Sequence, residues 1–194
     1  TLATQSLAEL CKQNGVRRYI FASTCSIYDQ GIGDDSIDEI QYESSEVSPK
    51  TAYSGSKYDA ERLLLEMADD DFCPVILRKG TIYGFSPRMR YDLVVNTLVK
   101  DALNKGYVSL NNGGEMWRPM IDIRDAGRAY IAALEADESK VRGEIFNVSG
   151  HNHRISELAI RVREAMSPMD IEIRPDYDYQ LVRSYRVSPE KIRR

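Results

Sequence analysis

Apolar residues recur at two spacings along the chain, and the two patterns alternate. A spacing of three or four residues, typical of helices with one buried face, predicts helices over residues 2–14, 53–67, 93–105, 122–136 and 156–166. Short apolar runs rich in β-branched and aromatic residues predict buried strands over residues 17–23, 73–78 and 144–148. Strands that alternate with helices in this way favour βαβ units, so we predict an α/β fold with a mostly parallel sheet.

Three stretches between these elements give weaker signals. Apolar residues on both sides of Asn111-Asn112-Gly113-Gly114 predict a strand, a tight turn and a second short strand. Residues 29–50 are acidic and rich in turn formers, which predicts a surface loop beside a site. Residues 171–173 form at most a short strand.

The composition describes an ordinary globular chain and excludes some classes of partner. Hydrophobic residues make up 42% of the 194 residues and charged residues 29%. A net charge of −4, with no basic run except Arg193-Arg194, argues against a nucleic-acid surface. Neither a run of 18 apolar residues nor a signal peptide is present in the sequence, so we expect no membrane insertion. Three cysteines without paired spacing indicate reduced thiols, and we predict a cytoplasmic location.

The first candidate for chemistry is a tyrosine with a lysine four residues later. Tyr53 and Lys57 begin the second predicted helix, and side chains four apart lie on one helix face. A nearby ammonium favours phenolate over phenol, so it would lower the pKa of the tyrosine from about 10. Such a tyrosine can take a proton from an alcohol and return it. The alternative is an exposed Tyr and Lys on a solvated helix.

Further polar residues follow two predicted strands at the places where those strands end. Ser23-Thr24 comes at the end of the first strand and Gly80-Thr81 just after the second. In mostly parallel sheets, ligands bind outside the carboxyl ends of the strands, so these residues are candidates for one site. The alternative is that Ser23 and Thr24 satisfy main-chain groups at a strand terminus.

Four motifs occur in an order that resembles the extended short-chain dehydrogenases/reductases. They are Phe21-Ala22-Ser23-Thr24-Cys25-Ser26-Ile27-Tyr28, Tyr53-x-x-x-Lys57, Leu77-Arg78-x-x-Thr81-x-Tyr83-Gly84 and Trp117-Arg118-Pro119-Met120-Ile121-Asp122-Ile123-Arg124-Asp125. More narrowly, the chain resembles the NAD-dependent epimerase/dehydratase family acting on nucleotide sugars. The resemblance covers nearly all 194 residues and implies a partial Rossmann-type sheet with a smaller mixed α/β substrate-binding lobe.

The resemblance implies a role for each residue near the cofactor. Tyr53 would be the general acid/base, and Lys57 would bind the nicotinamide ribose. Thr24 would hydrogen-bond the reacting sugar hydroxyl, as a fixed donor aimed at developing negative charge. Ser23 and Gly80 would also contact the cofactor, with Gly80 allowing the main chain to approach the nicotinamide.

On the substrate side the resemblance implies Thr81 and two arginines. Thr81 stands where many relatives carry a substrate-contacting Asn. Arg118 matches the diphosphate-binding Arg of the family, and its planar fork suits phosphate. Arg183 resembles a second phosphate-contacting Arg, with a surface role as the alternative. Asn96 would line the substrate side together with Arg88 and Arg90, unless all three lie on the helix surface.

Two differences from relatives narrow the expected chemistry. Dehydratases of this family carry an Asp-Glu pair after the Thr, and decarboxylases use a Glu where Ser26 stands; here the residues are Cys25-Ser26. Neither can act as a carboxylate, so these two reactions are disfavoured. Cys25 resembles the acid/base Cys of GDP-fucose synthases, but without a matching His near 84–92 we expect a small buried residue.

Dinucleotide-binding folds need a Gly-rich turn after their first strand, and none of the 12 glycines has the spacing of such a turn. Gly31 and Gly33 cannot replace it, because the neighbouring Asp34 and Asp35 would repel a pyrophosphate. We therefore expect residues 1–80 to be the C-terminal part of a dinucleotide-binding Rossmann domain with the catalytic helix. Residues 81–194 would form mainly the nucleotide-sugar lobe, interleaved with returning Rossmann elements. The implied cofactor is NAD, and NADP stays open because its determinants lie in the missing part. Taken alone, the chain is expected to bind a dinucleotide poorly.

The predicted function is NAD-dependent epimerisation of a nucleotide sugar at carbon 4, through a keto intermediate. The alternatives are a nucleotide-sugar ketoreductase and a catalytically silent nucleotide-binding scaffold. The apolar faces of the first two helices, together with the resemblance, imply a two-fold homodimer. His151-Asn152-His153 lacks a supporting Cys or carboxylate cluster, so we predict a polar loop and no metal site.

Overall fold

The computed structural model describes residues 1–29, 39–177 and 183–194. Its helices are α1 (Leu2–Gln13), η1 (Cys25–Tyr28), α2 (Ala52–Glu66), α3 (Val94–Lys105), η3 (Asn112–Gly114), α4 (Ile123–Glu135), α5 (Glu138–Val141), α6 (Ile155–Ala165) and η4 (Lys191–Arg193). Its strands are β1 (Arg18–Thr24), β2 (Ile40–Gln41), β3 (Cys73–Lys79), β4 (Thr81–Tyr83), β5 (Tyr107–Asn111), β6 (Trp117–Asp122), β7 (Glu144–Val148), β8 (His151–Arg154), β9 (Glu172–Asp176) and β10 (Arg186–Val187). No described helix combines the length and apolarity that a membrane span requires.

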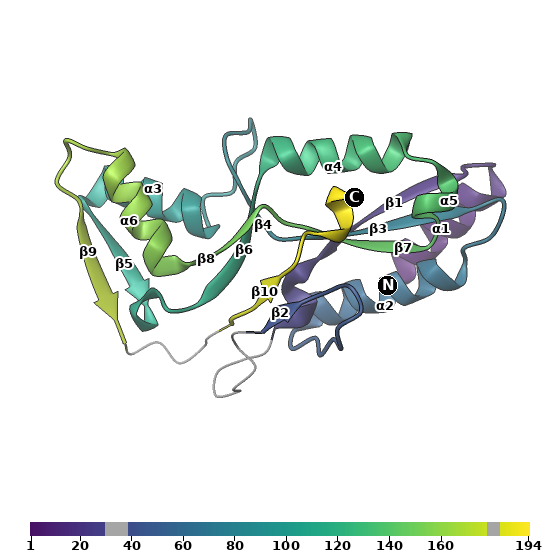
Figure 1. Ribbon diagram of the computed structural model, residues 1–194, viewed down its shortest axis with the longest axis horizontal. Helices are drawn as coiled ribbons and strands as arrows, with labels where there is room; N and C mark the ends of the chain where they lie inside the picture. Colours follow the sequence, from purple (N-terminus) through teal and green to yellow (C-terminus); the bar gives the residue numbers. More distant parts are fainter. Residues whose placement is uncertain (30–38, 178–182) are drawn as a thin grey trace.

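A three-layer unit contains the sheet that the sequence predicted. Strands β1, β3 and β7 pair in parallel in the order β1-β3-β7, with α1 and α2 on one face and α4 on the other (Figure 1). Because successive side chains of a strand point to opposite faces, Ile76 packs with Ala60 and Leu64 of α2, whereas Val75 and Leu77 pack on the α4 side. The predicted α/β fold with a mostly parallel sheet is confirmed.

A second group of elements lies beyond the end of this sheet (Figure 1). Helices α3 and α6 pack against the parallel pair β5–β9, and a separate apolar cluster that includes Leu98, Val108 and Leu158 fills the space between them. The sheet β4-β6-β8 connects the two groups, because β4 follows β3 after Gly80 alone. A cavity opens at the carboxyl ends of β1 and β3, where Thr24 and Lys79 line it.

Local signals place the helix ends where the sequence predicted. Gly15 follows α1 with φ +74° and Gly106 ends α3 with φ +72°, a conformation that glycine adopts without strain. The Thr51 side chain accepts a hydrogen bond from Ser54 N, and the Ser54 side chain accepts one from Thr51 N, so a capping box begins α2. Tyr53 is thus held in the first turn of α2.

The structure corrects one prediction about connections and refines two others. The predicted strand, tight turn and second strand are present as β5, η3 and β6, but the two strands do not pair with each other. Strand β5 pairs in parallel with β9, and β6 pairs with β4 and β8. Residues 151–154 form strand β8 rather than a polar loop, since β6 supplies the pairing that local sequence does not reveal. Of the predicted surface loop, 30–38 with Gly31 and Gly33 lies outside the described residues, while Asp29 and Gln41 are buried.

Candidate functional site

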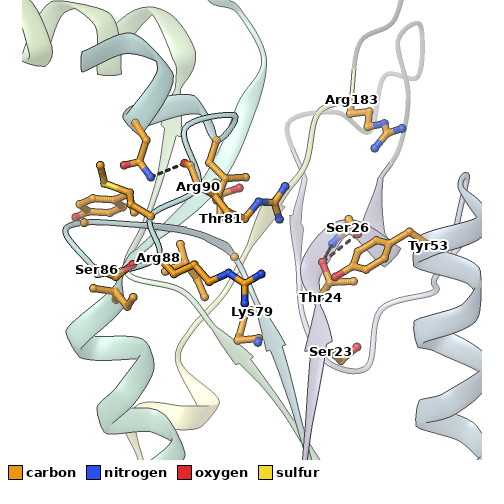
Figure 2. Close-up of a pocket in the computed structure, with 18 of the residues that line it drawn as sticks. Ser23, Thr24, Ser26, Tyr53, Lys79, Thr81, Ser86, Arg88, Arg90 and Arg183 are labelled. Carbon is orange, nitrogen blue, oxygen red and sulfur yellow. Dashed lines mark hydrogen bonds between the residues drawn. The ribbon is translucent and has the colours of Figure 1, made fainter. Parts of the chain in front are cut away.

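A cavity of about 620 Å³ opens at the carboxyl ends of β1 and β3. One wall comes from β1, η1 and α2, and the other from β4, the segment that leads to α3, and α3 itself (Figure 2). Its lining residues are Ser23, Thr24, Ser26, Tyr53, Lys79, Gly80, Thr81, Ile82, Tyr83, Gly84, Ser86, Arg88, Met89, Arg90, Leu93, Asn96, Ile123, Arg183 and Tyr185. The cavity lies where ligands bind in mostly parallel sheets.

Tyr53 and Thr24 meet in this cavity. The Tyr53 side chain, 58% exposed, points from α2 toward Thr24 and Ser26 (Figure 2). Thr24 Oγ1 lies 3.0 Å from Ser26 Oγ and accepts a hydrogen bond from Ser26 N at 3.1 Å. The Thr24 hydroxyl is thus fixed by its neighbours, and the geometry gathers three hydroxyl groups at the end of β1.

Lys57 takes a different place from the one that its spacing suggested. Its Nζ donates a hydrogen bond to Ala22 O at 2.9 Å and lies 4.7 Å from the centre of the Phe21 ring. Among the described residues no hydrogen bond joins Lys57 to the Tyr53 hydroxyl, and Lys57 is outside the cavity lining. Burial, and then the charge of Lys79, lower the pKa of Lys57.

Ser23 and Gly80 line the cavity, and each also contacts a residue in the interior of the fold. The Ser23 hydroxyl donates to the Glu61 carboxylate in the interior. A Cβ on Gly80 would lie 2.6 Å from Pro119 O, so Gly80 allows β6 to approach closely. Their cofactor contacts stay predictions.

Cys25 is fully buried beside these residues, as predicted. Its Sγ lies 3.0 Å from Arg78 O, to which the thiol donates, and burial raises the pKa of the thiol. The thiol therefore stays protonated and behaves as a small buried side chain.

The opposite wall gathers Thr81, Asn96, Arg88 and Arg90. Figure 2 shows both arginines pointing across the cavity toward the Thr24 wall. Arg90 Nη2 lies 2.6 Å from Asp92 Oδ2, and Asn96 Nδ2 donates to Arg90 O at 2.9 Å. The segment after β4 is thus held by its own contacts, with the Arg88 and Arg90 side chains at the cavity.

The structure separates the two arginines proposed for phosphate. Arg183 lines the cavity, and its Nε lies 3.6 Å from Asp29 Oδ2. Arg118 is not among the lining residues, and its Nη1 donates to Trp117 O at 2.7 Å and to Arg183 O. Burial lowers the pKa of the Arg118 guanidinium, and its position supports the main chain next to Arg183.

Lys79, Ser26 and Ser86 line the cavity, although no role was predicted for them from the sequence. The pairing of the strands places Lys79 at the cavity, because Lys79 on β3 is the register partner of Thr24 on β1. Its Nζ donates to Tyr130 OH at 3.0 Å. With Arg88, Arg90 and Arg183, Lys79 gives the described lining four cationic side chains and no carboxylate, a balance that suits an anionic ligand.

The two histidines do not line the cavity. The His151 and His153 rings lie on β8 with their centres 6.1 Å apart, and His153 Nδ1 is 3.4 Å from Glu157 Oε2. Within the described ranges, no three His, Cys, Asp or Glu side chains are grouped closely enough to hold a metal ion.

Comparison with known families agrees with the motifs. A model described as the NAD dependent epimerase/dehydratase family matches residues 1–149. The chain belongs to this family. A family member from Bacillus subtilis (strain 168), named "Uncharacterized UDP-glucose epimerase YtcB", is 30% identical over 149 residues, which cover 76% of this chain. The chain spans 44% of the length of that relative.

Solved structures of nucleotide-sugar enzymes share the fold. The UDP-glucuronic acid 4-epimerase from Bacillus cereus, in complex with UDP-glucuronic acid and NAD, superposes with a TM-score of 0.81 at 25% identity. That match covers 98% of this chain and 59% of the other. The Thermus thermophilus UDP-glucose 4-epimerase, in complex with NAD, gives a TM-score of 0.77 at 29% identity, covering 99% and 62%.

Proposed function

We propose that the protein is an NAD-dependent nucleotide-sugar epimerase that inverts a sugar carbon, carbon 4, through a keto intermediate. The observation that carries the proposal is the meeting of Tyr53 and Thr24 at the carboxyl end of β1, opposite Thr81, in a cavity lined by cations. Membership of the epimerase/dehydratase family and the similarity to two 4-epimerases support it.

The residues present fit the nicotinamide end of NAD. The Lys57 ammonium has three donors and uses one on Ala22 O, which leaves two for ribose hydroxyls. Ser23 and Gly80 line the cavity, and Lys57 lies outside the lining, bonded to the main chain next to Ser23. A bound NAD would supply reversible hydride transfer at the reacting sugar carbon.

The protein's own residues would move the proton and hold the sugar. Tyr53 takes the proton of the reacting hydroxyl as the carbon is oxidised and returns it on reduction. Thr24, fixed by Ser26, donates a hydrogen bond to the oxygen on which negative charge develops. Thr81 contacts the sugar from the other wall, and the cavity gives the keto sugar room to turn over between the two half-reactions.

The cationic side chains would bind the diphosphate of the nucleotide. Arg183 lines the cavity, and Arg118 holds the main chain of Arg183 through its hydrogen bond. Arg88 and Arg90 reach in from the segment before α3, where Asn96 fixes the main chain of Arg90. A guanidinium presents a planar fork that suits phosphate oxygens.

We also propose a two-fold homodimer through α1 and α2. Leu2, Leu7 and Leu10 of α1 are 80%, 54% and 56% exposed, an apolar face that a second copy would cover. The three free cysteines agree with a cytoplasmic location, which stays part of this proposal.

The proposal is tested by incubating the full-length protein with NAD⁺ and UDP-, GDP-, CDP- and dTDP-sugars, including uronates. Products are separated by chromatography and NADH is followed by absorbance. We expect an isomer of one substrate with no net change in NADH. Net consumption of NAD(P)H would favour the ketoreductase, which uses the same Tyr, Lys and Thr in one direction. Nucleotide binding without turnover would favour the scaffold.

A further inference from the structure

A buried ion pair contacts Ser23, one of the residues that line the cavity. Glu61 of α2 and Arg78 of β3 have side chains 1% and 3% exposed. Arg78 Nη2 lies 2.7 Å from Glu61 Oε2, and Arg78 Nε lies 3.1 Å from both carboxylate oxygens. Two parallel N–H···O contacts of this kind fix the orientation of both groups.

The pair sits in a row of polar residues that crosses the sheet. Ser23 on β1, Arg78 on β3 and Asn147 on β7 are register partners on neighbouring strands. The next pair in the same register, Thr24 and Lys79, lines the cavity. The ion pair is therefore one residue away from the site along the strands.

Hydrogen bonds extend the ion pair to every element of this wall. Ser23 Oγ donates to the Glu61 carboxylate, and Arg78 Nη1 donates to Tyr28 OH at 2.6 Å. Tyr28 OH in turn donates to Asn147 Oδ1 at 3.0 Å. The network thus connects α2 and η1 to three neighbouring strands of the sheet.

The position of Glu61 on α2 connects this network to Tyr53. Tyr53, Lys57 and Glu61 follow one another at intervals of four, so they lie along the side of α2 that faces β1. Lys57 is bonded to Ala22 O, and Glu61 to Ser23 and Arg78, so successive turns are attached to the sheet. Glu61 lies two turns, about 12 Å, along the helix from Tyr53.

Stability alone is a weak reason for such a pair. The apolar contacts of Ala60 and Leu64 already hold α2 on the sheet, but the hydrophobic effect has no direction. Burying two charges is costly, and apolar residues of similar volume in their place are often neutral or stabilising. The directional contacts of the ion pair restrict how far α2 can slide or rotate on β1.

We propose that Glu61 and Arg78 are positioning residues, which set the register of α2 on the sheet and so place Tyr53 opposite Thr24. The expected effect of the ion pair on turnover rests on the proposed function, whereas its expected effect on the position of α2 does not. A displacement of about 1 Å at a reacting group costs about 10²-fold in rate.

The test compares two changes at the pair in the full-length protein. Glu61→Gln keeps the side-chain shape and removes the charge, and Glu61→Leu with Arg78→Met replaces the pair by apolar groups. Glu138→Gln is the matched control, because Glu138 pairs with Arg17 and Arg142 at the opposite ends of the same strands. The measurements are kcat and KM, the melting temperature, and hydrogen exchange in residues 52–58 and 155–165.

For the apolar double variant we expect a melting temperature equal to or above that of the wild type. We expect kcat to fall about 10²-fold with KM changed less than about threefold, because a transition-state alignment is lost rather than binding. Hydrogen exchange should become faster in residues 52–58, at the start of α2, and stay unchanged in residues 155–165, which form α6. Glu138→Gln should match the wild type in kcat and in both segments.

Wild-type kcat in a folded double variant would overturn the positioning role. Unchanged exchange in 52–58 in both variants would also overturn it, and this result needs no activity. If the wild type turns over no nucleotide sugar, the proposed function fails, and the exchange measurement then decides the inference on its own. If Glu61→Gln does not fold, the apolar double variant gives the decision.

Discussion

The three residues proposed for proton transfer and hydrogen bonding, two in the cavity lining and Lys57 outside it, are each held differently. Tyr53 is exposed, Thr24 is fixed by Ser26, and Lys57 is fixed on a main-chain carbonyl. The sequence identified these three from the motifs and strand ends. It did not reveal that Lys57 turns to Ala22, because spacing on a helix defines a face but not a hydrogen-bond partner.

Glu61 and Arg78 show a second limit at this scale. Sequence patterns treat charged residues as solvent-facing, and most are. Arg78 nevertheless follows a buried apolar run, and the apolar β3 residues before it were the sequence signal for its burial. A partner 17 residues away on a helix cannot be inferred without the packing of α2 on β3.

The proposed role of the Thr24 hydroxyl gives a prediction. Thr24→Val removes the hydroxyl at nearly constant volume, and we expect kcat to fall about 10²-fold, as when a donor to a developing oxyanion is lost. Thr24→Ser keeps a hydroxyl at the same place and should retain most of the activity. Equal kcat values for the Val and Ser variants, measured by isomer formation, would contradict the assignment.

The buried Tyr185 predicts a pH dependence of stability. Burial raises the pKa of Tyr185, which is 7% exposed, so its folded form stays protonated where an unfolded tyrosine, with a pKa of about 10, ionises. The folded state then binds more protons, so the free energy of unfolding falls as pH rises above about 10, by up to about 1.4 kcal/mol per pH unit per tyrosine. Urea midpoints at pH 8 and pH 10.5 should therefore differ less in Tyr185→Phe than in the wild type. Identical pH slopes for the two proteins would disprove this.

The helices and strands that depend on short-range sequence patterns lie close to where those patterns predicted them. The helices α1, α2, α3 and α4 lie where apolar spacing and glycines predicted them. The failures are pairings. Strand β9 joins β5 across 60 residues of chain, and β2 pairs with β10 although each has only two residues. Such pairings depend on tertiary packing, which short-range patterns do not contain.

The close approach of β4 and β6 gives a prediction for Gly80. Gly80→Ala would place a Cβ 2.6 Å from Pro119 O, and relieving this contact should cost about 1–3 kcal/mol of stability. Gly127→Ala is the control, because Gly127 lies inside α4 with open space around it and should gain about 0.5–1 kcal/mol. Chemical denaturation measures both. A Gly80→Ala variant as stable as the wild type would show that the strands can separate freely.

The whole molecule consists of a sheet unit and a second group of elements with the cavity between them (Figure 1). The fold class followed from the alternation of helices and strands. The contents of the cavity did not, because its lining comes from residues 23–26, 53, 79–96, 123 and 183–185, which only the folded chain brings together.

The assembly is a prediction at this scale. Leu7→Glu places a charge in the exposed apolar face of α1, and we expect it to convert the proposed homodimer to monomers at micromolar concentration. Leu134→Glu changes an equally exposed leucine of α4 and should leave the dimer intact. Light scattering measures both masses. A monomeric wild type, or dimers of both variants, would place the interface elsewhere or remove it.

The central claim is that Tyr53 moves the proton when a sugar hydroxyl is oxidised, and turnover by Tyr53→Phe tests it most directly. The variant keeps the ring and loses only the hydroxyl, and Tyr42→Phe is the control because Tyr42 is also about half exposed but lies outside the cavity lining. We expect kcat for isomer formation to fall about 10²-fold or more in Tyr53→Phe, with the fold intact by circular dichroism. Tyr42→Phe should retain wild-type kcat. Wild-type turnover by Tyr53→Phe would contradict the account.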